Sequence, residues 1–217
     1  MTKIGVCLSG CGVNDDAEIH ESVITALALD RAGASIIYTA PNVIQKKVVD
    51  HYSGNEMYEN RNVLVESARI ARGDITDLVE LTADDMDGLI FPGGFGAVLN
   101  LCDFALKGAD CDIHPEVHRI IQEILKVNKP LGFICIAPAL FARAAKSSEK
   151  TIKILLAMIR QLQLILKNWE VSMKYAPLMI LLWTEKTKSY LLLPICWQAI
   201  FLKPLQALKN WFIESWN

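Results

Sequence analysis

A cysteine near the end of an apolar run is the strongest candidate nucleophile in this sequence. Cys135 lies in the predicted strand Leu131–Ile136, and the stretch CIAPAL places a helix start immediately after it. Backbone N–H groups and the helix dipole at such a turn lower the pKa of a thiol, which would make it reactive. Many buried cysteines are inert hydrophobic residues, so its position alone leaves a core thiol open as the alternative.

Other residues could complete a site around this cysteine. Gly93 and Gly94 follow an apolar run and carry no side chain, so their amides, with that of Ile136, could face a developing oxyanion. Glu21 opens a helix after the first predicted strand, where its carboxylate could act as a general acid or base. This combination favours the nucleophile over the core thiol.

Three further patterns have simpler explanations. SGCGVND follows a strand but lacks the third glycine of GxGxxG, because Asp15 occupies that position. His114 and His118 could share a helix face and bind a metal, yet Pro115 suggests a helix start and no third ligand is evident. The acidic stretch DDAEIHE is most simply a helix N-terminal cap. We therefore expect no metal and no organic cofactor.

The first two thirds of the chain alternate short apolar runs with longer amphipathic ones. This alternation predicts an α/β fold in which helices cover both faces of a mostly parallel sheet, a three-layer plan. The expected strands are Lys3–Ser9, Ser35–Ala40, Gly88–Pro92 and Leu131–Ile136. The expected helices are His20–Ala32, Asn62–Arg72 and His114–Val127. In such sheets the ligand crevice lies beyond the carboxyl ends of the strands, where all the candidate residues fall.

Composition excludes several classes of function. The chain has 217 residues, of which 52% are hydrophobic and 21% charged, enough for a sizeable core. A net charge of -2 offers no basic surface for nucleic acid. Six cysteines without a CxxC pair read as reduced thiols, and no export signal is visible. We therefore expect a cytoplasmic protein with no nucleic-acid or membrane partner.

Four stretches together resemble a known family: KIGVCLSGCGVNDDAEIHESV, YENRNVLVESARIARGDI, LIFPGGFGAVLNLCDFA and KPLGFICIAPAL. They are similar to the isoprenoid-biosynthesis glyoxalase (ElbB) branch of the ThiJ/PfpI superfamily, and the likeness covers about residues 1–145. It implies a flavodoxin-like sandwich, related to class I glutamine amidotransferases and usually dimeric. It also implies a nucleophilic cysteine at Cys135, a contacting glutamate at Glu21 and the glycine pair Gly93 and Gly94.

The chemistry that this resemblance implies is glutathione-independent glyoxalase activity. The Cys135 thiolate would add to the aldehyde of a 2-oxoaldehyde such as methylglyoxal, and Glu21 would move protons until a 2-hydroxy acid is released. The backbone amides would stabilise the oxyanion. Two alternatives stay open: a stress-sensing or binding protein with an oxidisable cysteine, and an inactive chain with an altered tail.

The tail, residues 146–217, differs from the rest of the chain and would replace the end of the same domain. All 12 glycines lie at or before Gly132, no aspartate follows Asp112, and all five tryptophans lie from Trp169 onward. Parallel α/β folds need glycine and aspartate in their turns, so this segment should be helical or disordered. Its apolar runs are shorter than the roughly 20 residues of a membrane span.

A shifted reading frame would explain this tail. Tryptophan has one codon, which constrains the alternative frame, and permitted codons then give LGGKHEICPVDDIVVDRK and STPAYMLAGNISEAAAGIEKLVYRVLE. Both strings resemble the C-terminal region of the family, in the right order and one register. We therefore predict a one-base shift between about Phe141 and Leu155.

Overall fold

The computed structural model describes residues 1–145 and the backbone of two later strands, residues 179–184 and 189–194. The helix predicted at Lys150–Leu166 lies outside the described residues, as does most of the segment assigned to the shifted frame. The two later strands carry the chain back to the sheet that the first 145 residues build.

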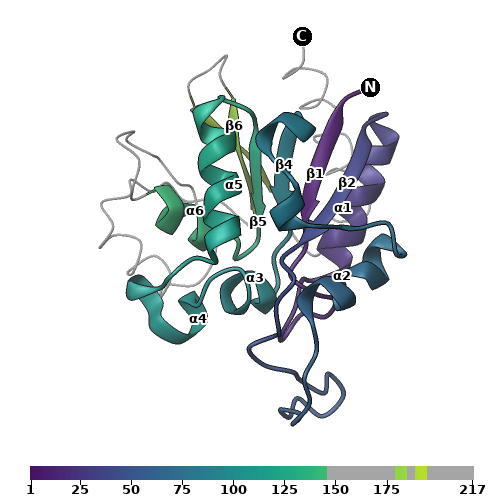
Figure 1. Ribbon diagram of the computed structural model, residues 1–217, viewed down its shortest axis with the longest axis vertical. Coiled ribbons are helices and arrows are strands. Elements are labelled where there is room, and N and C mark those ends of the chain that lie inside the picture. The colour runs from purple at the N-terminus through teal and green to yellow at the C-terminus, as the bar shows by residue number, and fades with distance from the viewer. Residues whose placement is uncertain (146–178, 185–188, 195–217) are drawn as a thin grey trace.

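A seven-stranded sheet forms the centre of the molecule (Figure 1), with strand order β3-β2-β1-β4-β5-β6-β7. The first five strands of that order are parallel, β6 is antiparallel to β5, and β7 is antiparallel to β6. The strands are β1 Lys3–Cys7, β2 Ser35–Ala40, β3 Thr76–Asp77, β4 Gly88–Phe91, β5 Leu131–Ile134, β6 Met179–Thr184 and β7 Ser189–Pro194. The four predicted strands are confirmed, and the two-residue β3 was missed because it is too short to show a periodicity.

The predicted helices are also confirmed, each within one residue at either end. The helices are α1 Ile19–Arg31, α2 Val63–Ala71, α3 Phe95–Leu99, α4 Phe104–Lys107, α5 Pro115–Lys126 and α6 Pro138–Ala145, with 3₁₀ turns at Leu78–Glu80, Ala83–Asp85 and Gly108–Asp110. Local chemistry sets their ends: the Asn62 side chain accepts from the amide of Val65 to cap α2, and Arg72 ends that helix in the left-handed conformation before Gly73.

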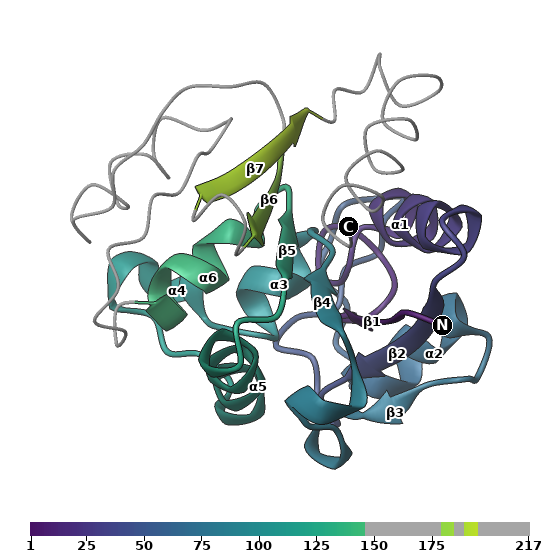
Figure 2. The ribbon, with the colours of Figure 1, turned by 90° about the horizontal axis from the view of Figure 1, so that it is seen from above.

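Alternating side chains of the strands divide the core into two clusters, one on each face of the sheet. Ile4 and Val6 belong to the cluster that includes Leu29 of α1. Phe91 and Phe133 belong to the other, where their rings stack with centroids 5.0 Å apart beside the buried face of α5. Figure 2 shows α1 and α5 on opposite sides of the sheet. This arrangement is the predicted three-layer, flavodoxin-like sandwich.

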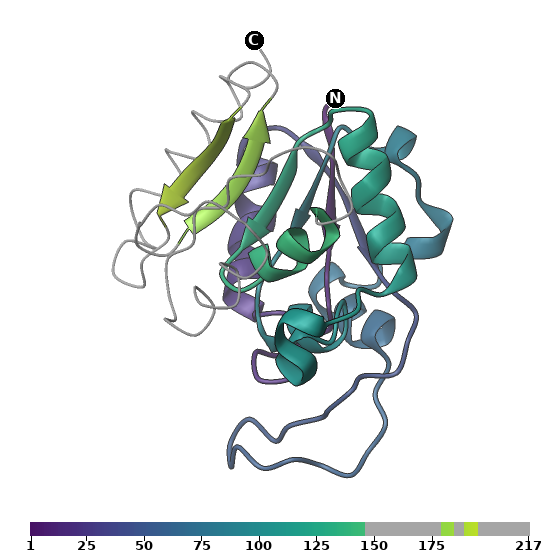
Figure 3. The same cartoon turned by 90° about the vertical axis from the view of Figure 1, so that its left-hand side faces the viewer.

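Loops at the carboxyl ends of the parallel strands gather at one edge of the sheet. The longest, residues 41–62 between β2 and α2, projects beyond that edge in Figure 3. The chain leaves β1 toward one face of the sheet and β4 toward the other, which makes the edge between them a topological switch point. Ligands of open α/β sheets bind at such points.

The C-terminal prediction is wrong for the two parts of the tail that the structure describes. We expected helix or disorder, yet β6 and β7 extend the sheet. The strand sequences MILLWT and SYLLLP are mostly apolar and lie on either side of the charged stretch EKTK, a pattern that suits two short strands joined by a turn. Within the described residues, no helix has the length and hydropathy needed to cross a bilayer.

Candidate functional site

Cys135 occupies a strained turn directly after β5. Its φ of 58° is in the left-handed region, which costs a non-glycine residue on the order of 1–3 kcal/mol. The amide of Ala137 donates to the carbonyl of Ile134 at 3.0 Å, so a tight turn carries the chain into α6. This geometry lifts the thiol out of the line of the strand, as a nucleophile elbow does.

Glu21 reaches the same point from the first turn of α1. Glu18 caps that helix, and its Oε2 accepts from the amide of Glu21 at 2.6 Å. The Glu21 carboxylate then accepts two hydrogen bonds, one from the Cys135 thiol and one from the amide of Gly93 at 2.9 Å. The structure therefore places a carboxylate in contact with the candidate nucleophile.

Gly93 must lack a side chain for this contact to exist. A Cβ at this position would lie 2.6 Å from the Cβ of Cys135, 2.6 Å from Oε2 of Glu21 and 2.9 Å from the carbonyl of Ile134. Gly94 has a φ of 91° and lies against the backbone of residues 16–18, so it also excludes a side chain. The two glycines bring β4 and the β1–α1 loop close enough to enclose the thiol and carboxylate.

The amide of Gly93 donates to the Glu21 carboxylate in the structure. In the structure this amide orients the carboxylate, and its predicted role as an oxyanion donor stays a prediction. The amides of Gly94 and Ile136 donate to the Cys135 sulfur, and they surround the atom at which a substrate would be bonded. These two amides remain the candidate oxyanion donors.

Burial raises the pKa of both partners of the Cys135–Glu21 pair. It raises the pKa of Glu21 to about 7 against an opposing effect of the hydrogen bonds from Cys135 and Gly93. Burial and the adjacent Glu21 charge raise the pKa of Cys135 to about 12, and the amides of Ile136 and Gly94 offset only part of this. The expected lowering of the thiol pKa is thus wrong, because desolvation and a like charge outweigh the amides.

The pair is consequently a thiol beside a carboxylate above pH 7, joined by a hydrogen bond. Such a thiol becomes nucleophilic when the neighbouring base removes its proton during attack. Glu21, with a pKa of about 7, suits that role near neutral pH. The arrangement can support covalent addition to an electrophilic carbon with proton transfer by one carboxyl group.

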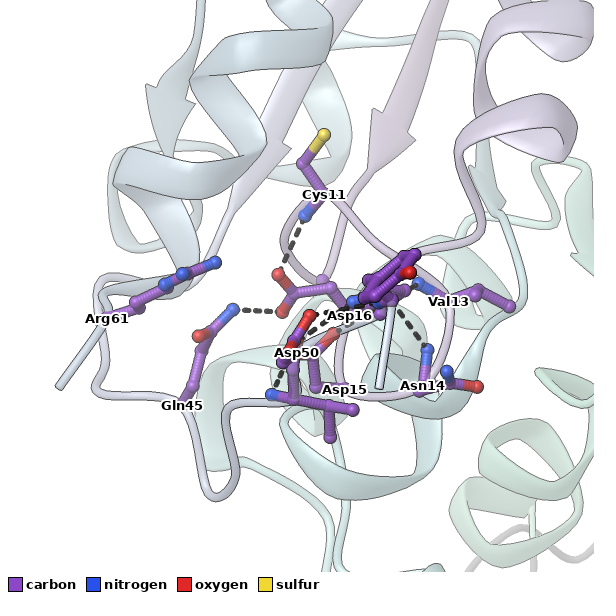
Figure 4. Close-up of polar contacts among 12 residues, drawn as sticks. Cys11, Val13, Asn14, Asp15, Asp16, Gln45, Asp50 and Arg61 are labelled. Atoms are coloured by element: carbon purple, nitrogen blue, oxygen red, sulfur yellow. Dashed lines mark hydrogen bonds and ion pairs between the residues drawn. The ribbon is translucent and has the colours of Figure 1, made fainter. Parts of the chain in front are cut away.

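A buried polar cluster, shown in Figure 4, holds the loop between β1 and α1. Asp16 is 1% exposed; its Oδ2 accepts from the amide of Cys11 at 3.0 Å, and its Oδ1 accepts from the side chains of Gln45 and Asn100. Burial raises the pKa of Asp16 to about 7. The carbonyl of Asp16 also accepts from Gly96 of α3 at 3.0 Å, so the cluster fixes this loop to α3.

Asp15 and His51 join the long loop to the same place. Oδ2 of Asp15 accepts from the amide of Val49 at 2.7 Å, and Nε2 of His51 lies near the amides of Val13 and Asn14 at 3.0 and 3.2 Å. Asp15 and Asp16 are therefore structural, and only Glu18 of the acidic stretch caps the helix as predicted. Gln45, His51 and Asn100 carried no spacing pattern from which the sequence could have placed them here.

The structure separates the remaining candidates from this site. His114 precedes α5 and Pro115 is the first residue of that helix, in line with the helix start predicted there. Among the described residues, no three His, Cys, Asp or Glu side chains are grouped so that they could hold a metal ion. Glu21, Gly93, Gly94, Cys135 and Ile136 are the predicted residues that meet at one point.

The sequence of this chain is similar to those of several mitochondrial proteins. No family model matches the chain. The human mitochondrial glutamine amidotransferase-like class 1 domain-containing protein 3 is 48% identical over 151 residues, which are 69% of this chain and 56% of that protein. The zebrafish mitochondrial ES1 protein is 38% identical over 156 residues, 70% of this chain and 58% of its own length. The chain spans little more than half the length of these relatives.

Solved structures agree on the fold. An isoprenoid biosynthesis protein with an amidotransferase-like domain from Ehrlichia chaffeensis is 26% identical, with a TM-score of 0.79 and full coverage of both chains. DJ-1 of Schizosaccharomyces pombe aligns with a TM-score of 0.52 at 21% identity, over 99% of this chain and 98% of DJ-1. At this identity the likeness shows the fold alone. The chain therefore has the predicted ThiJ/PfpI fold, similar to class I glutamine amidotransferases.

The expected cytoplasmic location is contradicted by these relatives. The human, rat and zebrafish proteins are all named as mitochondrial. The expectation relied on unpaired cysteines and on the first residues of the chain. Free thiols indicate reducing surroundings, which are shared by more than one compartment, so they could not distinguish the cytosol.

Proposed function

We propose that the protein folded around this site is a glutathione-independent glyoxalase that converts 2-oxoaldehydes to 2-hydroxy acids. The observation that supports the proposal most directly is the contact between the Cys135 thiol and the Glu21 carboxylate, with Gly93 orienting the carboxylate. A nucleophile and a single acid–base group suffice for this reaction, because the substrate is both oxidised and reduced internally and only water is added.

In the first step the Cys135 sulfur bonds to the aldehyde carbon as Glu21 takes the thiol proton. The amides of Gly94 and Ile136 then face the oxygen that becomes negative in the hemithioacetal. Glu21 first gives the thiol proton to this oxygen, which restores its carboxylate. It then carries the proton of the former aldehyde carbon to the neighbouring carbonyl oxygen, which gives an enediol. Transfer of the proton of the first hydroxyl to the neighbouring carbon then gives a thioester of the 2-hydroxy acid. Water cleaves the thioester, which releases the acid and restores the Cys135 thiol.

The alternative, a sensor that works through oxidation of Cys135, receives less support from the electrostatics. Sulfenic acid forms from the thiolate, and burial next to Glu21 raises the pKa of this thiol to about 12. A thiol that ionises only when a neighbouring base removes its proton is suited to attack on a bound electrophile.

Turnover of methylglyoxal by the purified protein tests the proposal, with product identified as lactate in the absence of glutathione. Cys135→Ser should remove turnover, whereas Cys7→Ser, at a buried position on β1, should retain it if it folds. Turnover that survives Cys135→Ser in a folded protein would refute the proposal. Rapid oxidation of Cys135 by peroxide with no turnover would favour the sensor.

We further propose that this protein is a member of the isoprenoid-biosynthesis branch whose tail is translated in a shifted frame. The curated matches extend over only 69–70% of the chain, and the unusual composition begins near residue 146. The coding DNA tests this directly, because an open alternative frame reading LGGKHEICPVDDIVVD must follow the codons for Phe141 to Leu155. Activity should therefore be measured for both the present chain and its frame-restored version.

A further inference from the structure

Two cysteines outside the candidate site lie in contact beside α3 and α4. Cys102 and Cys111 are hydrogen-bonded through their side chains, and the Cys102 thiol also donates to the carbonyl of Ala97 in the middle of α3 at 3.5 Å. Both belong to the core cluster on the α5 side of the sheet, whereas Cys135 packs against the other cluster. The pair is therefore distinct from the Cys135–Glu21 site.

A short ladder of hydrogen bonds holds the two thiols together. Cys102 pairs with Ile113 in an antiparallel bridge, and the amide of Asp103 donates to the carbonyl of Asp112 at 3.1 Å. The amide of Asp112 returns a bond to Oδ1 of Asp103 at 2.6 Å. Lys107 then bridges both carboxylates, at 2.6 Å from Asp103 and 2.9 Å from Asp112. The segment between the cysteines thus closes on itself.

The surroundings distinguish the two thiols chemically. The hydrogen bond from Cys102 and the positive charge of Arg143 lower the pKa of Cys111. Arg143, on α6, also donates from Nε to the carbonyl of Cys111 at 2.7 Å. The same contact with Cys111, together with burial, raises the pKa of Cys102. Cys111 is therefore the partner suited to attack, and Cys102 the partner that keeps its proton.

We propose that Cys102 and Cys111 form a redox dithiol that hydroperoxides convert to an intramolecular disulfide. The Cys111 thiolate attacks the O–O bond of hydrogen peroxide, which gives a sulfenic acid and hydroxide. The Cys102 sulfur then attacks the sulfenic sulfur, forms the S–S bond and releases water. Two thiols and one peroxide thereby give one disulfide and two waters, and a thiol reductant reverses the change.

Access of the oxidant follows from the local structure. Cys102 is 3% exposed and Cys111 is fully buried, so a large disulfide reagent cannot reach them in the closed fold. The segment that connects the two cysteines consists of the four-residue α4 and a three-residue 3₁₀ turn, and Leu106 within it is 66% exposed. Short elements of this kind open locally at low free energy, which admits a molecule as small as hydrogen peroxide.

Trypsin offers a direct test on the full chain, because Lys107 lies between the two cysteines. Cleavage after Arg72, Lys107 and Arg119 yields residues 73–107 and 108–119, each containing one cysteine. The reduced protein is treated with hydrogen peroxide, alkylated, digested and examined by mass spectrometry. We expect the two peptides to appear joined, with the loss of two hydrogens, and to separate after reduction.

Cysteine variants test which thiol is oxidised first and which thiol then forms the disulfide. Cys135→Ser should still give the joined peptides, because the pair does not use that thiol. Cys102→Ser should leave a sulfenic acid on Cys111 that dimedone traps. The proposal would be overturned if excess peroxide left both peptides alkylated, or if either cysteine paired with a different one. It would equally be overturned if Cys111 proceeded to sulfinic acid in the wild-type protein while Cys102 stayed free.

Discussion

Replacement of Glu21 by glutamine should stabilise the fold at alkaline pH and at the same time suppress the proposed reaction. Burial raises the pKa of this carboxyl from its ordinary value of 4.5 to about 7. In the unfolded chain it ionises near the ordinary value, so the native protein holds its proton more tightly. A buried carboxylate that must ionise for catalysis therefore destabilises the native state, and a neutral amide of the same shape does not.

The direction and the size of this change in stability follow from the difference between the pKa of Glu21 in the folded and in the unfolded chain. Below pH 4.5 the carboxyl is protonated in both states, and its contribution to stability is fully present. As pH rises through about 7 that contribution is lost, and the difference from 4.5 corresponds to about 3 kcal/mol. Glu21→Gln has no such loss. Its stability relative to wild type should therefore rise by about 3 kcal/mol between about pH 4.5 and pH 8.

Urea unfolding at both pH values measures this change, followed by circular dichroism because all five tryptophans lie in the tail. The comparison uses the change in the free energy of unfolding between the two pH values. This change cancels any effect of the substitution on hydrogen bonding that is the same at both pH values. Glu56→Gln, at a side chain 55% exposed, is the control and should shift little. Equal pH dependence in wild type and Glu21→Gln would refute the assignment of a raised pKa to Glu21.

Three further outcomes are expected. In the frame-restored protein, Glu21→Gln should lower 2-oxoaldehyde turnover by about 10²-fold or more, and unchanged turnover would mean that another group moves the proton. The wild-type kcat/KM should rise with pH through about 7 as Glu21 ionises, and a profile flat between pH 6 and 8 would contradict this. Gly93→Ala should abolish turnover because its Cβ would meet Cys135 and Glu21 at 2.6 Å. Gly54→Ala would meet no atom within 4 Å and would strain only its own loop, where φ is 75°, so turnover should stay intact.

The elements of the first 145 residues could be predicted because their patterns are local. Ser35–Ala40 is an apolar run of strand length, and α5 repeats apolar residues at helical spacing between Pro115 and Lys126. The two-residue β3 offers no such pattern. The strands β6 and β7 were mistaken because apolar runs without glycine or aspartate are compatible with either helix or strand. The pairing of β6 with β5, and of β7 with β6, decides between the two.

The residues of the candidate site were identifiable for the same reason, since each follows a strand or opens a helix. The roles of these residues were harder to predict from the sequence. The amide of Gly93 is bonded to Glu21, which no spacing could reveal. The contact between Cys102 and Cys111 depends on a loop that folds back through Asp103 and Asp112. The cluster around Asp16 likewise joins residues from three separate loops.

The sequence by itself determined that strands and helices alternate and that Cys135, Glu21 and the glycine pair emerge at the carboxyl ends of parallel strands. Those features depend on the spacing of neighbouring residues, which the chain carries wherever it folds. Only the tertiary structure decided the charge and proton affinity of the pair. The pKa of Cys135 reflects desolvation and the charge of Glu21, which lies more than a hundred residues away in the chain. Local turn geometry favours a thiolate, but burial beside a carboxylate keeps the proton on sulfur.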